Sequence, residues 1–203
     1  MTNVIGVITW NDLFRVTVIP IYVMVVANLT NMHSGYNGLQ SGLSIIILLT
    51  LLFKAWIDGI PETILPGSAI LGSMVAFWFF NKYPAKIFEG NIGSLLFGST
   101  IGCVIIIQEF WWFGFFILIP HTFNFILWLF WLRLMKTNPE LYLEGDGIHR
   151  KFGYLNSEGY ITVPNRLTLK WIPNYYFNLD EKTSVLVMYS VTLFFCSLGI
   201  FIF

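Results

Sequence analysis

The sequence predicts an all-α polytopic membrane protein with about six transmembrane helices and a cytoplasmic flap that contains a short β-hairpin. Of the 203 residues, 56% are hydrophobic and only 11% are charged, whereas soluble domains carry about 25% charged residues. Residues 1–135 hold 10 of the 22 charged residues, 136–182 hold 12, and 183–203 hold none. We therefore expect the first and last segments to lie in a bilayer. This excludes a secreted disulfide scaffold, a disordered tail and a free nucleic-acid binder.

Six apolar runs approach the roughly 20 residues that a transmembrane helix needs. They are Leu13–Val26, Leu43–Ile57, Ile64–Phe80, Ile92–Gln108, Trp111–Leu134 and Thr183–Phe203. The fifth run contains Pro120, His121 and Asn124, for which a kinked, packed helix and a functional role both stay open. Gly98 and Gly102 in the fourth run predict close packing against a neighbouring helix.

These runs divide the chain into three parts. Residues 1–135 form a five-span region with two cytoplasmic motif loops, residues 136–182 form the flap, and residues 183–203 form the last transmembrane helix. Within the flap, Tyr154–Val163 alternates around the turn sequence Asn-Ser-Glu-Gly, which predicts a hairpin. The flap is too short to build a core of its own, so we expect it to lean on the helix ends.

Counting the spans places the loops at 27–42, 81–91 and 135–182 on one side of the membrane. Nine of the 11 basic residues belong to that side or its edge, and only Arg15 and Lys54 belong to the other. Since Lys and Arg concentrate in cytoplasmic loops, we predict that the first side is cytoplasmic.

Three polar stretches fall on this predicted cytoplasmic side. In Ala27–Gly42, Asn28 and Asn31 share a helix face, and their amides can bind a headgroup or a nucleotide; a capped hydrophilic loop is the alternative. In Asn81–Ser94, a helix start near Gly90-Asn91 can bind phosphate. The third stretch, Gly145–Lys151, is basic and either clamps a diphosphate or touches lipid headgroups.

The residues of these stretches follow a recognisable order. They read Asn28-x-x-Asn31-x-x-x-Gly35-x-Asn37-Gly38-Leu39, then Tyr83-Pro84-Ala85-Lys86-Ile87-Phe88-x-Gly90-Asn91-x-Gly93-Ser94-Leu95, then Pro120-x-x-Phe123-Asn124. This pattern resembles the polyprenyl-phosphate N-acetylhexosamine-1-phosphate transferases, glycosyltransferase family 4. It looks most like the archaeal and eukaryotic UDP-GlcNAc:dolichyl-phosphate branch, and the resemblance runs over nearly all of the chain.

The resemblance implies an activity and a set of site residues. The reaction is transfer of a sugar 1-phosphate, expected to be GlcNAc-1-phosphate, from a UDP-sugar to polyprenyl or dolichyl phosphate, with release of UMP. It is the first step of lipid-linked glycan assembly, and it uses Mg²⁺, with Mn²⁺ as an alternative, to neutralise the diphosphate. By resemblance the catalytic residues are Asn91, His149 and Arg150, the metal ligands are Asn31 and Asn91, and the substrate-binding residues are Asn28, Asn37, Phe88, Lys86 and Arg150.

Individual roles follow from the same resemblance. Asn37 matches a position that reads uracil, and Phe88 matches one that packs on the uridine. The pair His149-Arg150 resembles a basic motif that grips the diphosphate and the N-acetyl sugar. The resemblance also implies an integral protein of an archaeal or prokaryotic plasma membrane, or of the endoplasmic reticulum in a eukaryote, with its active face in the cytoplasm.

Two features depart from the family pattern. Gly90-Asn91 stands where the best-known members have Gly-Asp, and a neutral amide is a weaker ligand for Mg²⁺ than a carboxylate. The family motif Asp-Asp-x-x-Asp is absent, because Asp58, Asp146 and Asp180 each stand alone. The chain looks like the carboxyl-terminal portion of such an enzyme. We therefore expect an amino-terminal half or a second copy as a partner, besides the UDP-sugar, the lipid phosphate and the bilayer.

Two other functions stay open from the sequence. One is a non-catalytic membrane subunit, or a truncated remnant, that keeps the fold without turnover. The other is a small transporter, for which His121 and Asn124 are the candidates at mid-membrane depth. Against the transporter, most of the polar groups gather at one surface, whereas transport sites lie near the midplane.

Overall fold

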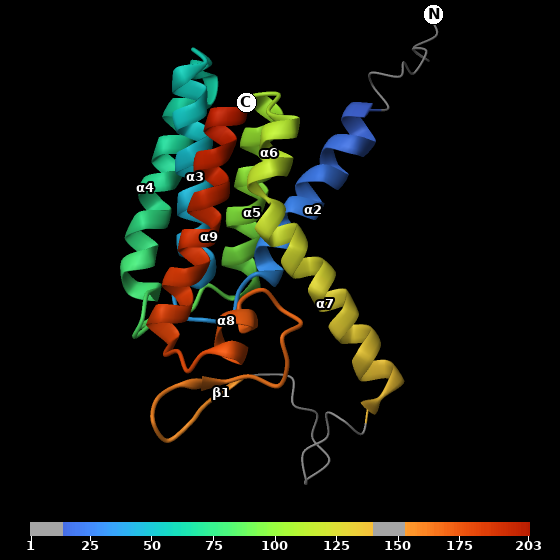
Figure 1. Ribbon diagram of the computed structural model, residues 1–203. Coiled ribbons are helices and arrows are strands. Elements are labelled where there is room, and N and C mark those ends of the chain that lie inside the picture. The colour runs from blue at the N-terminus through green and yellow to red at the C-terminus, as the bar shows by residue number, and fades with distance from the viewer. Residues whose placement is uncertain (1–13, 140–152) are drawn as a thin grey trace, which may run out of the picture.

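The computed structural model describes residues 14–139 and 153–203, which form a helical bundle with a small polar cap at one end (Figure 1). Five of the helices are long and apolar enough to cross a membrane, or six if the bent pair α6–α7 is one span. These confirm the predicted all-α, membrane-spanning fold class. The elements are η1 (Phe14–Val18), α2 (Ile19–Met32), α3 (Leu39–Ile57), η2 (Pro61–Thr63), α4 (Ile64–Asn81), α5 (Gly90–Ile107), α6 (Trp111–Ile117), α7 (Ile119–Thr137), β1 (Tyr154–Leu155), β2 (Ile161–Thr162), α8 (Trp171–Tyr176) and α9 (Glu181–Ile202).

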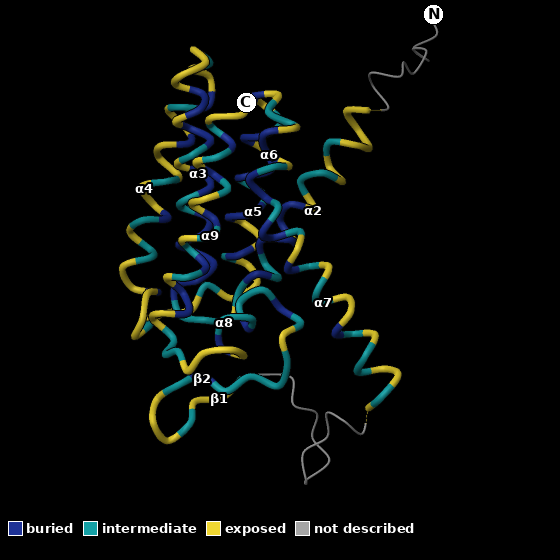
Figure 2. Tube along the Cα trace, in the orientation of Figure 1, coloured by how far each residue is buried: buried dark blue, intermediate teal, exposed yellow. Residues whose placement is uncertain are grey.

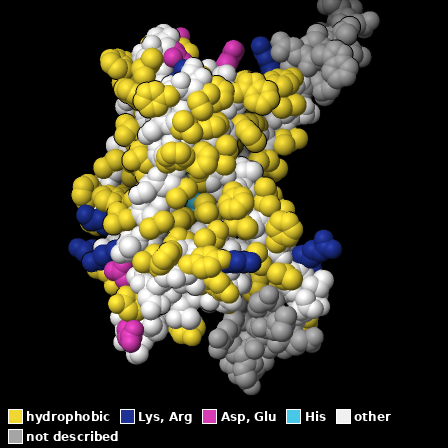
Figure 3. Space-filling model, viewed as in Figure 1, with side chains coloured by type: hydrophobic (Ala, Val, Ile, Leu, Met, Phe, Trp, Pro, Cys, Tyr) yellow, Lys and Arg dark blue, Asp and Glu magenta, His cyan; other side chains and the backbone are white. Residues whose placement is uncertain are grey.

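The predicted motif loops meet at one end of the bundle, which we call the motif end. Loop 33–38, loop 82–89 and the polar segment 153–180 all lie there, and α9 ends at the opposite end (Figure 1). On the face drawn in Figure 3, most Lys and Arg side chains gather at the motif end, below a largely hydrophobic surface. The alternation of the helices therefore agrees with the loop assignment from the sequence.

Helix α3 lies at the centre of the bundle and contacts α4, α5 and α9. Its Leu48 and Leu51 are fully buried, together with Ile101 of α5 and Ile117 of α6. The buried segments lie along the inner faces of the helices, and the exposed ones face outward (Figure 2). Many outward side chains are large and apolar, such as Leu65 at 82% exposure, as expected for a surface covered by lipid.

The first motif loop is shorter than predicted. The sequence placed residues 27–42 in a loop, but α2 continues to Met32 and α3 begins at Leu39. The polar residues do not end the helix because they bond within it. Asn28 Nδ2 donates to Met24 O at 2.8 Å, and Thr30 Oγ1 donates to Val26 O at 2.8 Å.

The predicted fifth span is a sharply bent pair of helices rather than one kinked helix. Helices α6 and α7 are bent by 59°, with Pro120 in the first turn of α7, where its missing N–H costs nothing. Asn124 donates to Met32 O at 3.1 Å and accepts from the Leu169 N–H at 2.9 Å. His121 is buried against His33. These contacts favour the packed-helix interpretation of this trio.

The predicted hairpin is present. Tyr154 pairs with Thr162, and Leu155 with Ile161, in an antiparallel two-stranded sheet. In the turn, Asn156 Oδ1 accepts hydrogen bonds from the backbone N–H groups of residues 158 and 160. The flap leans on the helix ends as expected, since α8 contacts both β2 and α9.

Two glycines of α5 let it pack closely on a neighbouring helix, as the sequence predicts, and the structure shows that this neighbour is α2. A Cβ atom on Gly98 would lie 2.6 Å from Ala27 Cα, and one on Gly102 would lie 3.2 Å from Val23 Cα. Both neighbours are backbone atoms, so a side chain at Gly98 forces the helices apart. This close contact holds the ends of the two helices together at the motif end.

Replacing Gly98 by alanine is expected to lower the free energy of unfolding by about 1–3 kcal/mol, because it overpacks the α2–α5 contact. The matched control is Gly72→Ala on α4, where a Cβ atom would meet nothing within 4 Å. That change is expected to be neutral or stabilising, since alanine favours helix over glycine by about 1 kcal/mol. Unfolding of detergent-solubilised protein measures both, and equal effects would refute the packing role of Gly98.

Candidate functional site

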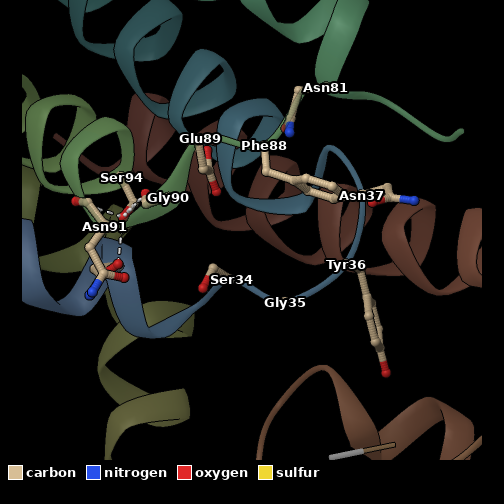
Figure 4. A pocket seen from close by; sticks show the side chains of 11 residues that line it. Ser34, Gly35, Tyr36, Asn37, Asn81, Phe88, Glu89, Gly90, Asn91 and Ser94 are labelled. Carbon is tan, nitrogen blue, oxygen red and sulfur yellow. Dashed lines mark hydrogen bonds between the residues drawn. The ribbon is translucent and has the colours of Figure 1, made fainter. Parts of the chain in front are cut away.

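The two motif loops enclose one cavity of about 210 Å³ at the motif end (Figure 4). Its lining comes from helices far apart in the sequence: the end of α2 and loop 33–38, the end of α4, and the start of α5 with the residues before it. The lining residues are Asn31, Ser34, Gly35, Tyr36, Asn37, Asn81, Phe88, Glu89, Gly90, Asn91 and Ser94. Amides and hydroxyls dominate this wall, so it suits a polar ligand with both donors and acceptors.

One end of the cavity, the amide end, is formed by Asn31, Asn91 and Ser94. The Ser94 hydroxyl bonds to Asn31 Oδ1 and also lies 3.0 Å from the Gly90 carbonyl oxygen (Figure 4). Ser94 thereby links the last turn of α2 to the first turn of α5. The glycine contact between these helices places the two asparagines beside the same cavity.

The other end of the cavity carries an exposed aromatic ring. Phe88 is 78% exposed, and in Figure 4 it lies on the side of the cavity where Asn37 and Asn81 are found. Asn81 is buried, accepts a hydrogen bond from Ser41 at 2.7 Å, and donates to Ile87 O at 3.0 Å. Asn81 therefore fixes the backbone next to Phe88. The sequence pattern does not predict this role, although an amide at the end of an apolar span is a signal for it.

Loop 33–38 is held by the carboxyl-terminal part of the chain. The Asn37 N–H donates to Glu181 Oε1 at 2.6 Å, across 144 residues of sequence. Tyr36 donates through its hydroxyl to Asn174 Oδ1 at 3.2 Å. These contacts fix the conformation of a loop that contributes four residues to the cavity lining.

Lys170 supports the same loop from behind. Its ammonium donates to the Ser34 carbonyl oxygen and lies 5.6 Å from the centre of the Tyr36 ring. Gly35 has a φ of +113°, a backbone conformation that favours glycine, and a Cβ atom there would meet the Lys170 ammonium. Burial lowers the pKa of Lys170 to about 8.

The lowered pKa of Lys170 predicts a pH-dependent stability. Between pH 8 and its ordinary pKa of 10.5, the unfolded chain binds more protons at this residue than the folded one. The free energy of unfolding should therefore rise with pH in this window, by up to about 1.4 kcal/mol per pH unit. In the Lys170→Met variant this contribution is absent. Unfolding of both proteins from pH 7 to 10.5 tests it, and a constant difference between them would refute it.

Glu89 is the one acidic residue among those that line the cavity. Burial raises the pKa of its carboxyl group to about 7. Its Oε2 atom is buried and has no hydrogen-bond partner. Glu89 is not among the site residues predicted from the sequence, although it directly precedes Gly90-Asn91 and is one of only 11 acidic residues.

The structure brings half of the sequence-predicted site residues into this cavity. Those that line it are Asn31, Asn37, Phe88 and Asn91. Asn28 and Lys86 are exposed and do not line it. The predicted residues His149 and Arg150 lie outside the described residues. Across residues 14–139 and 153–203, no three His, Cys, Asp or Glu side chains cluster in a way that could hold a metal.

The chain matches known proteins over most of its length. The family model for glycosyl transferase family 4 matches residues 1–109. A putative glycosyltransferase of Methanocaldococcus jannaschii is 28% identical over 205 residues, covering 98% of this chain and 64% of the relative. A putative UDP-N-acetylglucosamine–dolichyl-phosphate N-acetylglucosaminephosphotransferase of Sulfolobus acidocaldarius is 32% identical, covering 81% of this chain and 47% of the relative.

A bacterial relative matches a shorter region. The phospho-N-acetylmuramoyl-pentapeptide-transferase of Shouchella clausii is 35% identical over 83 residues, covering 41% of this chain and 26% of the relative. The chain thus spans less than two thirds of the length of each of these relatives. The family model nevertheless covers more than half of the chain and includes every residue that lines the cavity. The chain is an integral membrane protein that belongs to glycosyl transferase family 4.

Proposed function

We propose that this chain provides the nucleotide-sugar site of a membrane transferase that moves a sugar 1-phosphate from a UDP-sugar to a polyprenyl phosphate. The observation that carries the proposal is that Asn31, Asn37, Phe88 and Asn91 all line the same cavity. The names of the archaeal relatives favour GlcNAc as the sugar and dolichyl phosphate as the acceptor. The motif end, with its basic residues, then faces the cytoplasm, where UDP-sugars are found.

The uridine binds at the aromatic end of the cavity. The exposed ring of Phe88 offers a stacking surface for uracil, which is worth about 1–3 kcal/mol for a nucleic-acid base. Asn37, fixed by Glu181 through its backbone N–H, offers an amide group that pairs with the donors and acceptors of the uracil edge. The diphosphate then extends toward the amide end and the start of α5, where a helix N-terminus favours negative charge.

Magnesium is the cofactor that the family resemblance implies, and the residues present fit it. The cavity wall offers the amide oxygens of Asn31 and Asn91 and one buried carboxylate oxygen without a partner. Oxygen ligands of this kind suit a hard divalent cation. Asn31 and Asn91 would hold the ion. When bound, it would neutralise charge on the diphosphate.

In the reaction, an oxygen of the lipid phosphate attacks the phosphorus bonded to the sugar oxygen. A new phosphorus–oxygen bond forms to the lipid phosphate, the bond to the bridging oxygen breaks, and UMP leaves with that oxygen. The chain contributes positioning: Phe88 and Asn37 hold the uridine, and the amide end holds the diphosphate. His149 and Arg150 are proposed to grip the diphosphate and the N-acetyl group.

The lipid acceptor approaches from the bilayer along α2 and α5. An apolar groove between these helices is lined by residues such as Val23, Ala27, Ile92 and Leu96. Ile92 of the groove directly follows Asn91 of the amide end in the sequence. We place the isoprenoid chain in this groove, with its phosphate at the amide end.

Nucleotide binding tests the proposal without requiring turnover. The chain is purified in nanodiscs together with any segment or subunit that accompanies it in its membrane, and UDP-GlcNAc binding is measured by calorimetry. Saturable binding that UMP displaces and AMP does not is the expected result. Absence of saturable binding, or equal displacement by AMP, would refute a uridine site.

A further inference from the structure

The wall of the cavity contains one carboxyl group and no cationic side chain to pair with it. Among the lining residues Glu89 is the only acid, and no Lys or Arg belongs to the lining. In the described part of the chain, the one salt bridge joins Lys54, in the last turn of α3, to Asp58 at its C-cap, at the opposite end of the bundle. Lys170 approaches the motif loop, but its ammonium donates to the Ser34 carbonyl oxygen. A cation bound in the cavity would balance the charge of Glu89.

No hydrogen bond or ion pair in the described part of the chain explains why the half-buried Glu89 places one carboxylate oxygen out of contact with water. It occupies the N-cap position of α5, yet makes no capping hydrogen bond. Its Oε2 atom is buried and unpartnered, and leaving a buried polar group without a hydrogen bond is unfavourable, more so for a charged group. A residue kept at such a cost is typical of a site that is completed by a ligand.

Glu89 lies where a ligand that spans both ends of the cavity would pass. In Figure 4 its carboxyl group points into the cavity, between Asn91 and Ser94 on one side and Phe88 and Asn37 on the other. A diphosphate that joins a uridine at one end to a sugar near the other crosses this position. Magnesium binds typically through one or two carboxylates, substrate phosphates and several waters, so a single carboxylate suffices.

We propose that Glu89 is the anionic ligand of a divalent cation in this cavity, with the amide oxygens of Asn31 and Asn91 as neutral ligands. This inference rests on the proposed function for the identity of the phosphate ligand. It assigns the main metal ligand to a residue outside the sequence-predicted set. A carboxylate at this site supplies charge that two amides lack, and charge dominates the affinity for hard cations.

The test uses Mn²⁺ as the probe, because free and bound Mn²⁺ are distinguished by electron paramagnetic resonance. The protein in nanodiscs is titrated with Mn²⁺ without nucleotide and again with UDP. We expect Glu89→Gln, which keeps the shape and removes the charge, to weaken Mn²⁺ binding at least about ten-fold. Glu89→Asp, which keeps the charge, should stay closer to the unmodified protein. Glu62→Gln, on an exposed residue before α4, should bind Mn²⁺ unchanged.

The outcomes separate this inference from the proposed function. Undiminished Mn²⁺ affinity in a folded Glu89→Gln protein would overturn the role of Glu89, whether or not the enzyme transfers sugar phosphate. Absence of any saturable Mn²⁺ binding, with and without UDP, would overturn it as well. Binding that depends on Glu89 in a protein that neither binds UDP-GlcNAc nor releases UMP would support the cation site and refute the transferase.

Discussion

Replacing Asn31 by alanine is expected to reduce sugar-phosphate transfer by about 100-fold or more, equivalent to about 2.7 kcal/mol of transition-state stabilisation. At the amide end, Asn31 Oδ1 accepts a hydrogen bond from the Ser94 hydroxyl. The same amide oxygen is one of the proposed neutral metal ligands. Its loss removes an oxygen that faces the diphosphate and leaves Ser94 without its link to α2. Transfer is measured as UMP released per minute at saturating UDP-GlcNAc and lipid phosphate.

The control for Asn31 is Asn138→Ala. Asn138 lies after the last turn of α7, bonds to Thr137 and does not line the cavity. Its replacement should leave transfer within about two-fold of the unmodified enzyme, as for surface substitutions in general. Equal rates for the two variants, with both proteins folded, would remove Asn31 from the site.

Replacing Glu181 by alanine is expected to raise the KM for the UDP-sugar by about ten-fold or more, with a smaller change in kcat. The Glu181 carboxylate holds the backbone N–H of Asn37 at 2.6 Å. A hydrogen bond of this kind to a charged group contributes about 1.5–3 kcal/mol. Glu181 does not line the cavity and acts through Asn37, so it is a positioning residue. Without it, loop 33–38 is less ordered, and part of the uridine binding free energy is spent on ordering the loop.

Glu181→Gln separates positioning from other roles. Glutamine keeps an oxygen that accepts from the Asn37 N–H, so this variant should recover most of the lost affinity. A merely structural role at the start of α9 would instead change thermal stability and leave KM unaffected. An unchanged KM in Glu181→Ala would therefore contradict the positioning role.

The sequence predicts the helices well, because long apolar runs are a local pattern that defines the spans. The spacing of Gly98 and Gly102 predicts close packing of α5 on a neighbouring helix, and the structure shows that α2 is this neighbour and that Asn31 and Asn91 line one cavity. The predicted end of the first span was wrong because the polar residues that follow Val26 were assigned to a loop. The side chains of Asn28 and Thr30 donate hydrogen bonds to backbone carbonyl groups one turn earlier, so the helix continues.

The residues that hold loop 33–38 in place, and the role of Glu89, could not be predicted from sequence patterns. The contact between Asn37 and Glu181 joins residues 144 positions apart, and no periodicity connects α9 to a loop after α2. In the sequence, Lys170 is an ordinary basic loop residue, and only the structure shows that it is buried behind Gly35. Glu89 stood at an unassigned position of the motif, since its importance depends on burial and on the charge of its neighbours. The proposed role of Glu89 would supply the predicted metal site with the carboxylate that Asn91 lacks.

Transfer itself is the measurement that tests the central proposal most directly. The chain, with every segment and subunit that accompanies it in its membrane, is incubated with UDP-GlcNAc and dolichyl phosphate, and UMP is quantified. The proposal predicts UMP release that requires the lipid phosphate, stops when EDTA removes divalent cations, and returns with Mg²⁺. UDP-GlcNAc binding without any UMP release under these conditions would contradict it and would indicate a membrane subunit that retains the site without the reaction.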